Sequence, residues 1–206
     1  MIDKLLQNIA PHYCYSCHKI GNVLCDSCIY NIANDAENAC IECRLPTSSG
    51  ICSSCNIPFS KAWVIGSREG ELASLVGDFK WARLRAAHGP LSDLLDVYLP
   101  ILPISTVVVP IPTIPRHKRI RGYDHADLIA SSFAKTRRLE KQKLLSRKTN
   151  SVQHKANKVE RRKQAEQAFY CNFKLDPNVP YLLVDDIVTT GATIKAATRV
   201  LKGAGA

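Results

Sequence analysis

A short stretch near the end of the chain has the residue types and spacing suited to binding a phosphorylated sugar. Residues 182–194 read Leu-Leu-Val-Asp-Asp-Ile-Val-Thr-Thr-Gly-Ala-Thr-Ile. The apolar start is typical of a buried parallel strand. Asp185 and Asp186 accept hydrogen bonds and therefore suit vicinal sugar hydroxyls. The following loop opens a helix, where unpaired amides and the helix dipole favour a phosphate. The expected loop ligands are Val188, Thr189, Thr190, Gly191, Ala192 and Thr193.

A group of arginines follows a second apolar run. Residues 105–112 predict a buried strand that ends in a proline-constrained turn, and Arg116 and Arg121 come soon after it. Guanidinium groups bind phosphate oxygens in a bidentate manner. We therefore predict that these arginines hold a further phosphate group. A plain, solvated basic loop is the alternative.

The cysteines form a separate feature, because eight of the nine lie before residue 56. They make four Cys-x-x-Cys pairs: Cys14 and Cys17, Cys25 and Cys28, Cys40 and Cys43, Cys52 and Cys55. In a reducing compartment such pairs are typical of metal sites, and tetrahedral thiolate coordination suits Zn²⁺. We predict two closed, structural zinc sites that supply folding energy to a segment with few large apolar residues. Sequential pairing is the simplest; interleaved pairing and a disulfide framework are the alternatives.

The scaffold that positions these residues is predicted to be α/β, with a mostly parallel sheet flanked by helices and ligands at the carboxyl ends of strands. We expect a small cysteine module over residues 1–57 and a larger domain over 58–206. Apolar spacing predicts strands over 61–66, 105–112 and the start of 182–194, and helices over 69–87, 91–99 and 124–138. The proline-rich, uncharged run 97–115 is not expected to cross a membrane.

Charge is unevenly distributed along the chain. Residues 116–174 hold 17 Lys and Arg against 5 Asp and Glu, a net +12, whereas the whole chain carries +10. Such a basic face attracts polyanions, and we favour nucleic acid over a merely solvated surface. The first ten residues lack the apolar core of a secretory signal, so we expect a cytoplasmic protein.

Together these features resemble the ComF family. The matching pieces are the cysteine module, Phe79-Lys80, the segment 110–123, Arg147 with Gln153, Glu160-Arg161 and the segment 182–194. The resemblance implies a double zinc ribbon followed by a type I phosphoribosyltransferase-like domain. It also implies binding of 5-phosphoribosyl-1-pyrophosphate (PRPP) with Mg²⁺. In type I phosphoribosyltransferases the two acids meet the ribose hydroxyls, the Thr-Thr-Gly loop wraps the 5-phosphate and the turn that corresponds to the one after residues 105–112 faces pyrophosphate.

The family resemblance further implies a role in natural competence, with single-stranded DNA and other DNA-uptake proteins as partners. Relatives are also described as amidophosphoribosyltransferase-like. The first hypothesis is thus a PRPP-binding protein that handles single-stranded DNA. The second is an active phosphoribosyltransferase that transfers phosphoribosyl to an unidentified nucleobase or amine. The third is a structural zinc adaptor without a working pocket.

Three departures from the family pattern affect these hypotheses. Residues 121–125 read Arg-Gly-Tyr-Asp-His where the family has Arg-Gly-Phe-Asn-Gln. Asp124 thereby adds a negative charge near the expected phosphate site. The printed sequence ends where relatives continue into another strand, so we expect the last strand to be missing. No base-recognition segment, nucleophile or general base is evident, and His125 is read as a surface or helix-cap residue.

Overall fold

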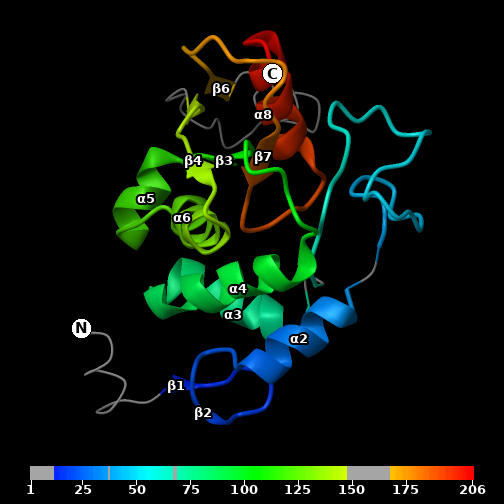
Figure 1. Ribbon diagram of the computed structural model, residues 1–206. Helices are drawn as coiled ribbons and strands as arrows, with labels where there is room; N and C mark the ends of the chain where they lie inside the picture. Colours follow the sequence, from blue (N-terminus) through cyan, green and yellow to red (C-terminus); the bar gives the residue numbers. More distant parts are fainter. Residues whose placement is uncertain (1–11, 37, 67–68, 148–167) are drawn as a thin grey trace, which may run out of the picture. The chain divides into compact units, whose positions relative to one another are not determined.

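The computed structural model describes residues 12–36, 38–66, 69–147 and 168–206 (Figure 1). The chain divides into two compact units, each built from two separate segments. The first unit comprises Met1–Glu37 and Ile65–Pro100, and the second comprises Asn38–Val64 and Ile101–Ala206. The described residues form six α-helices and a three-stranded parallel sheet, which confirms the predicted mixed α/β class.

The first unit is mainly helical. It contains a small antiparallel pair, β1 (His12–Tyr13) and β2 (Ile20–Gly21), and then α2 (Asp26–Asn34). The later segment supplies α3 (Gly70–Trp81), the short 3₁₀ helix η1 (Arg85–Ala87) and α4 (His88–Tyr98). Helix α2 packs against α4. Leu75, Phe79 and Ala87 are fully buried, so apolar burial holds these helices together.

The sequence predicted one continuous helix over 69–87, and that prediction is wrong. Helix α3 ends at Trp81, and η1 begins only at Arg85. Between them Arg83 has φ 58°, a left-handed conformation that a right-handed helix cannot include. The next helix also starts earlier than expected, at His88 rather than at residue 91.

The second unit is organised around the parallel sheet. Strand β3 (Val107–Pro110) lies at its centre, between β4 (Glu140–Lys141) and β7 (Tyr181–Val184). Both neighbours run parallel to β3. A separate antiparallel pair consists of β5 (Ser146–Arg147) and β6 (Phe169–Tyr170). Four consecutive buried residues make up β3, as expected for a strand covered on both faces.

Helices cover the two faces of this sheet. Val107 and Val109 share a core with Ala196, Ala197 and Leu201 of α8 (Ala192–Gly203). Side chains alternate along a strand, so the intervening residue of β3 faces the other side. Helix α6 (His125–Arg137) packs on β3, β4 and β7, and a shorter helix, α5 (Pro115–Arg121), precedes it (Figure 1).

The predicted strand over 61–66 is absent from the structure. The backbone amide of Ala62 instead donates to the carbonyl oxygen of Ser49 at 2.9 Å. A Cβ added to Gly50 would lie 1.9 Å from the Ala62 carbonyl oxygen, so the two backbones are in close contact. This segment therefore satisfies its hydrogen bonding on a cysteine-bearing loop rather than in a sheet. Within the described ranges no helix is long and apolar enough to cross a membrane.

Candidate functional site

The carboxyl ends of β3 and β7 lie side by side and bring together the two predicted phosphate-binding segments. Val109 pairs with Leu183, and Pro110 pairs with Val184. The ladder continues one step further, because the amide of Ile111 donates to the carbonyl oxygen of Val184 at 2.9 Å. Asp185 and the turn at Pro112 consequently leave the same edge of the sheet, where ligands bind in parallel α/β proteins.

The loop after β7 leads from the two acids into α8. Asp185 and Asp186 are half-buried, and the amide of Asp186 donates to Oδ1 of Asp185 at 3.0 Å. Thr189 and Thr190 are exposed, whereas Gly191 is buried and adopts φ 67° as the N-cap of α8. Val188, Ala192 and Thr193 are half-buried. The loop thus places two exposed hydroxyls at the start of a twelve-residue helix, shortly after the two carboxylates, and the Thr190 hydroxyl accepts from the amide of Ala192 at 3.4 Å. A helix N-terminus favours anions.

The arginines after β3 occupy two different environments. Arg116 is exposed in the first turn of α5. Arg121, at the end of that helix, is buried, and its Nη1 lies 3.3 Å from Nδ1 of His125. His125 is fully buried and makes an edge-to-face contact with Tyr123. The interpretation of His125 as a surface residue is therefore wrong.

Asp124 has a structural partner on each side. Its carboxylate accepts from the amide of Thr113 at 3.2 Å and from the Thr113 hydroxyl at 3.0 Å. It also accepts from the amide of Asp127 as the N-cap of α6. The carboxylate that departs from the family pattern thus joins the turn after β3 to the start of α6.

Arg147 is a further cation at this edge, and the sequence pointed to it only through the family resemblance. Its Nη1 lies 3.4 Å from the carbonyl oxygen of Pro112, and its guanidinium lies 5.0 Å from the centre of the Phe169 ring. Burial lowers the pKa of Arg147, and attraction to the Asp185 carboxylate opposes that shift. Arg147 therefore links the turn after β3 to the acidic end of β7. The sequence signal available for Arg147 was its place shortly after the apolar pair Leu144–Leu145, which the structure shows to be buried.

Gln153, Glu160 and Arg161, and part of the basic segment 116–174, lie outside the described residues.

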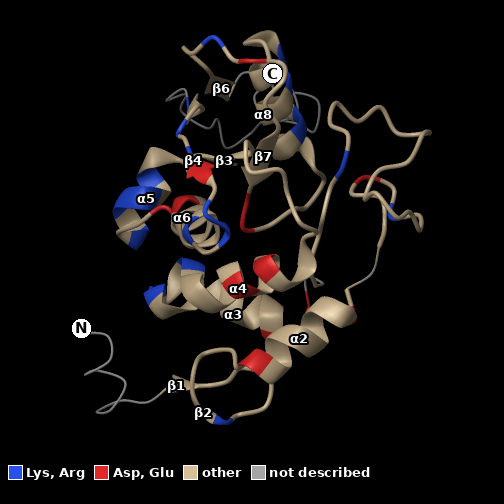
Figure 2. Cartoon of the chain, in the orientation of Figure 1, with Lys and Arg blue, Asp and Glu red and all other residues tan. Residues whose placement is uncertain are grey.

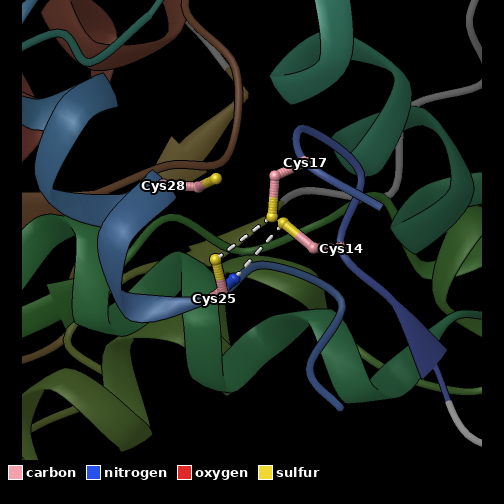
Figure 3. A group of neighbouring side chains, drawn as sticks. All are labelled: Cys14, Cys17, Cys25 and Cys28. Carbon is pink, nitrogen blue, oxygen red and sulfur yellow. Dashed lines mark hydrogen bonds between the residues drawn. The ribbon is translucent and has the colours of Figure 1, made fainter. Parts of the chain in front are cut away.

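The eight N-terminal cysteines form two separate groups. Cys14, Cys17, Cys25 and Cys28 make up cluster one, and Cys40, Cys43, Cys52 and Cys55 make up cluster two. This is the sequential pairing rather than the interleaved one. Figure 3 shows the four side chains of cluster one directed toward a common centre. All nine cysteines have free thiols, so no disulfide framework is present.

The dimensions of both clusters fit a tetrahedral metal ion. Within each group all sulfur atoms lie within 4.8 Å of one another. Sγ of Cys17 is 3.5 Å from Sγ of Cys25, and Sγ of Cys43 is 3.6 Å from Sγ of Cys52. Zn–S bonds of about 2.3 Å place tetrahedral ligands about 3.8 Å apart. Each cluster could therefore hold one Zn²⁺ through four cysteines.

The local backbone repeats between the two clusters. The amide of Cys14 donates to Lys19 O, and that of Cys40 donates to Leu45 O. The residues four positions after these cysteines, His18 and Arg44, have φ values of 59° and 62° and donate back to the cysteine carbonyls. The clusters differ after this turn: Cys25 is the N-cap of helix α2, whereas residues 53–66, which follow Cys52, form no helix.

The first cysteine of each cluster is the one whose thiolate the surroundings favour. Burial opposes ionisation of Cys14, but the amides of Cys17, Cys25 and Ser16 lower its pKa to about 6. The amide of Cys43 is the largest cause that lowers the pKa of Cys40 to about 6. The Ser16 hydroxyl favours the Cys28 thiolate, yet burial and the other three thiols raise the pKa of Cys28 to about 12. Thiolates are the form that binds metals.

Comparison with known proteins gives no match: no protein-family model, no curated protein and no solved structure matches this chain.

Proposed function

We propose that the second unit binds PRPP, or a related ribose phosphate, at the shared edge of β3 and β7. The observation that carries this proposal is the parallel pairing of the two strands, which puts the acid pair and Thr-Thr-Gly loop beside the turn after β3. Asp185 and Asp186 would accept hydrogen bonds from the ribose hydroxyls. The first amides of α8 would hold the 5-phosphate.

The other half of the ligand would extend toward the turn after β3. Arg147 lies at this turn, and Arg116 is exposed on the helix that follows it. A bound Mg²⁺ would supply charge neutralisation to the pyrophosphate, and Asp185 and Asp186 would be the residues to hold it. Arg121 would not contact the ligand itself, since it is buried against His125; its role would be to support the turn from inside the fold.

Single-stranded DNA is the proposed macromolecular partner, as in the handling of incoming DNA. Helix α5 carries three exposed cations, Arg116, Lys118 and Arg119, and no acidic residue (Figure 2). Ile120 on the same helix is 51% exposed and offers an apolar surface beside them. Cations combined with an apolar surface suit a flexible polyanion with exposed bases. Zinc at the two cysteine clusters is proposed to stabilise the fold of each unit.

One thermal-unfolding experiment tests the ligand proposal. The zinc-loaded full chain is heated with PRPP and Mg²⁺, with ribose 5-phosphate and with single-stranded DNA. A ligand at about one hundred times its Kd should stabilise the protein by about 2.7 kcal/mol. The shift caused by PRPP should be lost in Asp186→Asn, whereas the shift caused by DNA should persist. An unchanged melting temperature with PRPP at millimolar concentration would refute the proposal.

The same samples address catalysis. Incubation with PRPP, Mg²⁺ and ammonia or a panel of nucleobases is followed by measurement of released pyrophosphate. Acceptor-dependent release that disappears in Asp186→Asn would identify a phosphoribosyltransferase. Binding of PRPP without release would identify a binding protein.

A further inference from the structure

We propose that cysteine cluster two is a positioning part of the phosphate site, whereas cluster one is not. This inference rests on the proposed ribose-phosphate function. It concerns the knuckle, defined as residues 40–43, and its contacts with the first turns of α8. Both lie in the second unit of the chain.

The first contact is an ion pair between the knuckle and α8. Glu42 lies between the two cysteines of the pair Cys40 and Cys43 in the sequence. Its Oε2 is 2.5 Å from Nζ of Lys195. The Lys195 side chain is only 9% exposed, so this cation is directed into the protein. The Glu42 side chain is 38% exposed, so the pair is only half-buried. Removing Glu42 would nevertheless leave the buried Lys195 ammonium without this partner, and an uncompensated buried charge is costly.

The second contact is apolar and reaches the N-cap of α8. Ile41, which is 2% exposed, lies beside Gly191, and a Cβ on that glycine would be 3.9 Å from Cγ1 of Ile41. Lys195 is one turn into the helix, and its amide bonds to the carbonyl oxygen of Gly191 at 2.9 Å. The knuckle thus contacts the helix at both ends of its first turn, which follows the exposed Thr189 and Thr190 in the chain.

The knuckle is itself held by contacts with the rest of the cysteine-bearing loop. The amide of Ile41 donates to Gly50 O, and the segment through Gly50 is in close backbone contact with Ala62. Cys40, fully buried, ties this loop to the other three cysteines of the cluster. A metal held by the four sulfurs would fix the loop, and the loop fixes the helix turn that presents amides to the phosphate.

Cluster one uses the equivalent positions for a different purpose. Tyr15 follows Cys14 as Ile41 follows Cys40, and its hydroxyl donates to Oδ2 of Asp78 on α3 at 2.5 Å. That contact stays within the first unit. The two knuckles therefore provide a matched pair: one is anchored to a structural helix and the other to the phosphate-loop helix.

The test compares Glu42→Gln with Tyr15→Phe in the zinc-loaded full chain. Hydrogen exchange is measured for residues 190–198, with α6 as an internal reference, together with metal content and PRPP–Mg²⁺ affinity. Glu42→Gln should accelerate exchange in 190–198 only, keep two metal ions and weaken PRPP binding about fivefold or more, a typical coupling between linked sites. Tyr15→Phe should change neither the exchange of residues 190–198 nor the PRPP affinity. Glu42→Asp, which keeps the charge, should restore part of both.

A second pair of variants tests the metal itself. Cys43→Ser and Cys17→Ser each disrupt one cluster, and only Cys43→Ser should loosen residues 190–198. Unchanged exchange over 190–198 in both Glu42→Gln and Cys43→Ser would overturn the inference. If wild type fails to bind PRPP while Glu42→Gln still loosens 190–198, the positioning role stands and the proposed ligand is wrong.

Discussion

The amide of Ile111 donates to the carbonyl oxygen of Val184 at 2.9 Å, so the two predicted phosphate-binding segments leave the sheet at one level. A one-residue slip between β3 and β7 would turn every side chain of one strand to the other face. In the observed register Val107 and Val109 share a core with α8. The sheet register is therefore what aligns the acid pair with the turn after β3.

Gly191→Ala should destabilise the protein and weaken PRPP binding. Gly191 has φ 67°, and residues with a Cβ pay about 1–2 kcal/mol to adopt that left-handed conformation. Relief of the strain would shift the first amides of α8, which are the proposed phosphate ligands. Denaturant unfolding and a PRPP titration measure the two effects.

Gly77→Ala is the matched control for this substitution. Gly77 lies within α3 and has no neighbouring atom within 4 Å of an added Cβ. Alanine there should stabilise the protein by about 0.5–1 kcal/mol, because it restricts the unfolded chain at no steric cost. Equal stability changes in the two variants would contradict the role assigned to the Gly191 backbone.

Asp124→Asn should retain the fold, whereas Asp124→Ala should not retain full stability. Asparagine has a single acceptor oxygen, so it can keep the hydrogen bonds that Oδ1 accepts from the Thr113 hydroxyl and the Asp127 amide, but not the one that Oδ2 accepts from the Thr113 amide. Alanine loses all three hydrogen bonds and should cost about 0.5–2 kcal/mol, as for other N-caps. Asp124→Asn also removes a negative charge near the proposed pyrophosphate end, so PRPP affinity should stay equal or rise. A fall in PRPP affinity would contradict this expectation.

Local signals explain what could be predicted from the sequence. The helix predicted over 124–138 is α6 (His125–Arg137), with Asp124 as N-cap and Arg138, at φ 54°, as C-cap. Its apolar spacing and capping residue lie within one continuous stretch. The strand and helix of segment 182–194, and the grouping of the cysteines into Cys-x-x-Cys pairs, are local in the same sense.

Long-range contacts explain what could not be predicted. The strand expected over 61–66 is replaced by a backbone hydrogen bond from Ala62 to Ser49 and a close contact with Gly50, which apolar content alone does not reveal. The pairing of Glu42 with Lys195 joins residues distant in sequence, and neither residue stands out by type. The burial of His125 depends on Tyr123 and Arg121 packing around it. A single sequence carries no signal for such tertiary partners.

Metal content should fall by one ion per chain when either cluster is disrupted. Wild type should carry two Zn²⁺, and Cys28→Ser should carry one, because the four sulfur atoms of cluster one act as a set. Cys171→Ser, outside both clusters, should keep two. Elemental analysis of the purified protein measures the ratio. Two ions in Cys28→Ser would show that three thiolates and another ligand suffice.

Substitution of cations on α5 should weaken DNA binding and reduce its salt dependence. Lys118 and Arg119 are exposed, and each phosphate contact on a single strand contributes about −0.7 to the slope of log K against log salt. Lys118→Ala combined with Arg119→Ala should therefore lower the magnitude of the slope by about 1.4. Lys202→Ala, an exposed cation on α8, is the matched control. An unchanged slope in the double variant would place the DNA elsewhere.

Asp127 should stabilise the protein at neutral pH and lose that contribution in acid. Its carboxylate lies 2.6 Å from Nζ of Lys141 and 2.8 Å from Nζ of Lys143. Burial raises the pKa of Asp127, but the two lysines outweigh it and the net shift is downward. A lowered pKa in the folded state means that the stabilisation is complete above the unfolded value of about 3.9. The stabilisation disappears as the pH falls through the folded pKa.

Asp127→Asn should accordingly lower the free energy of unfolding by about 1.5–3 kcal/mol at pH 7, the range for hydrogen bonds to charged groups. The difference from wild type should shrink below about pH 4. Lys141→Gln should cost more than Lys143→Gln, because the Lys141 side chain is 23% exposed and that of Lys143 is 61% exposed. Urea unfolding at pH 7, 5 and 3 measures all three variants. A difference between Asp127→Asn and wild type that stays constant from pH 7 to pH 3 would show that the amide–carboxylate exchange acts through packing, and not through the charge of Asp127.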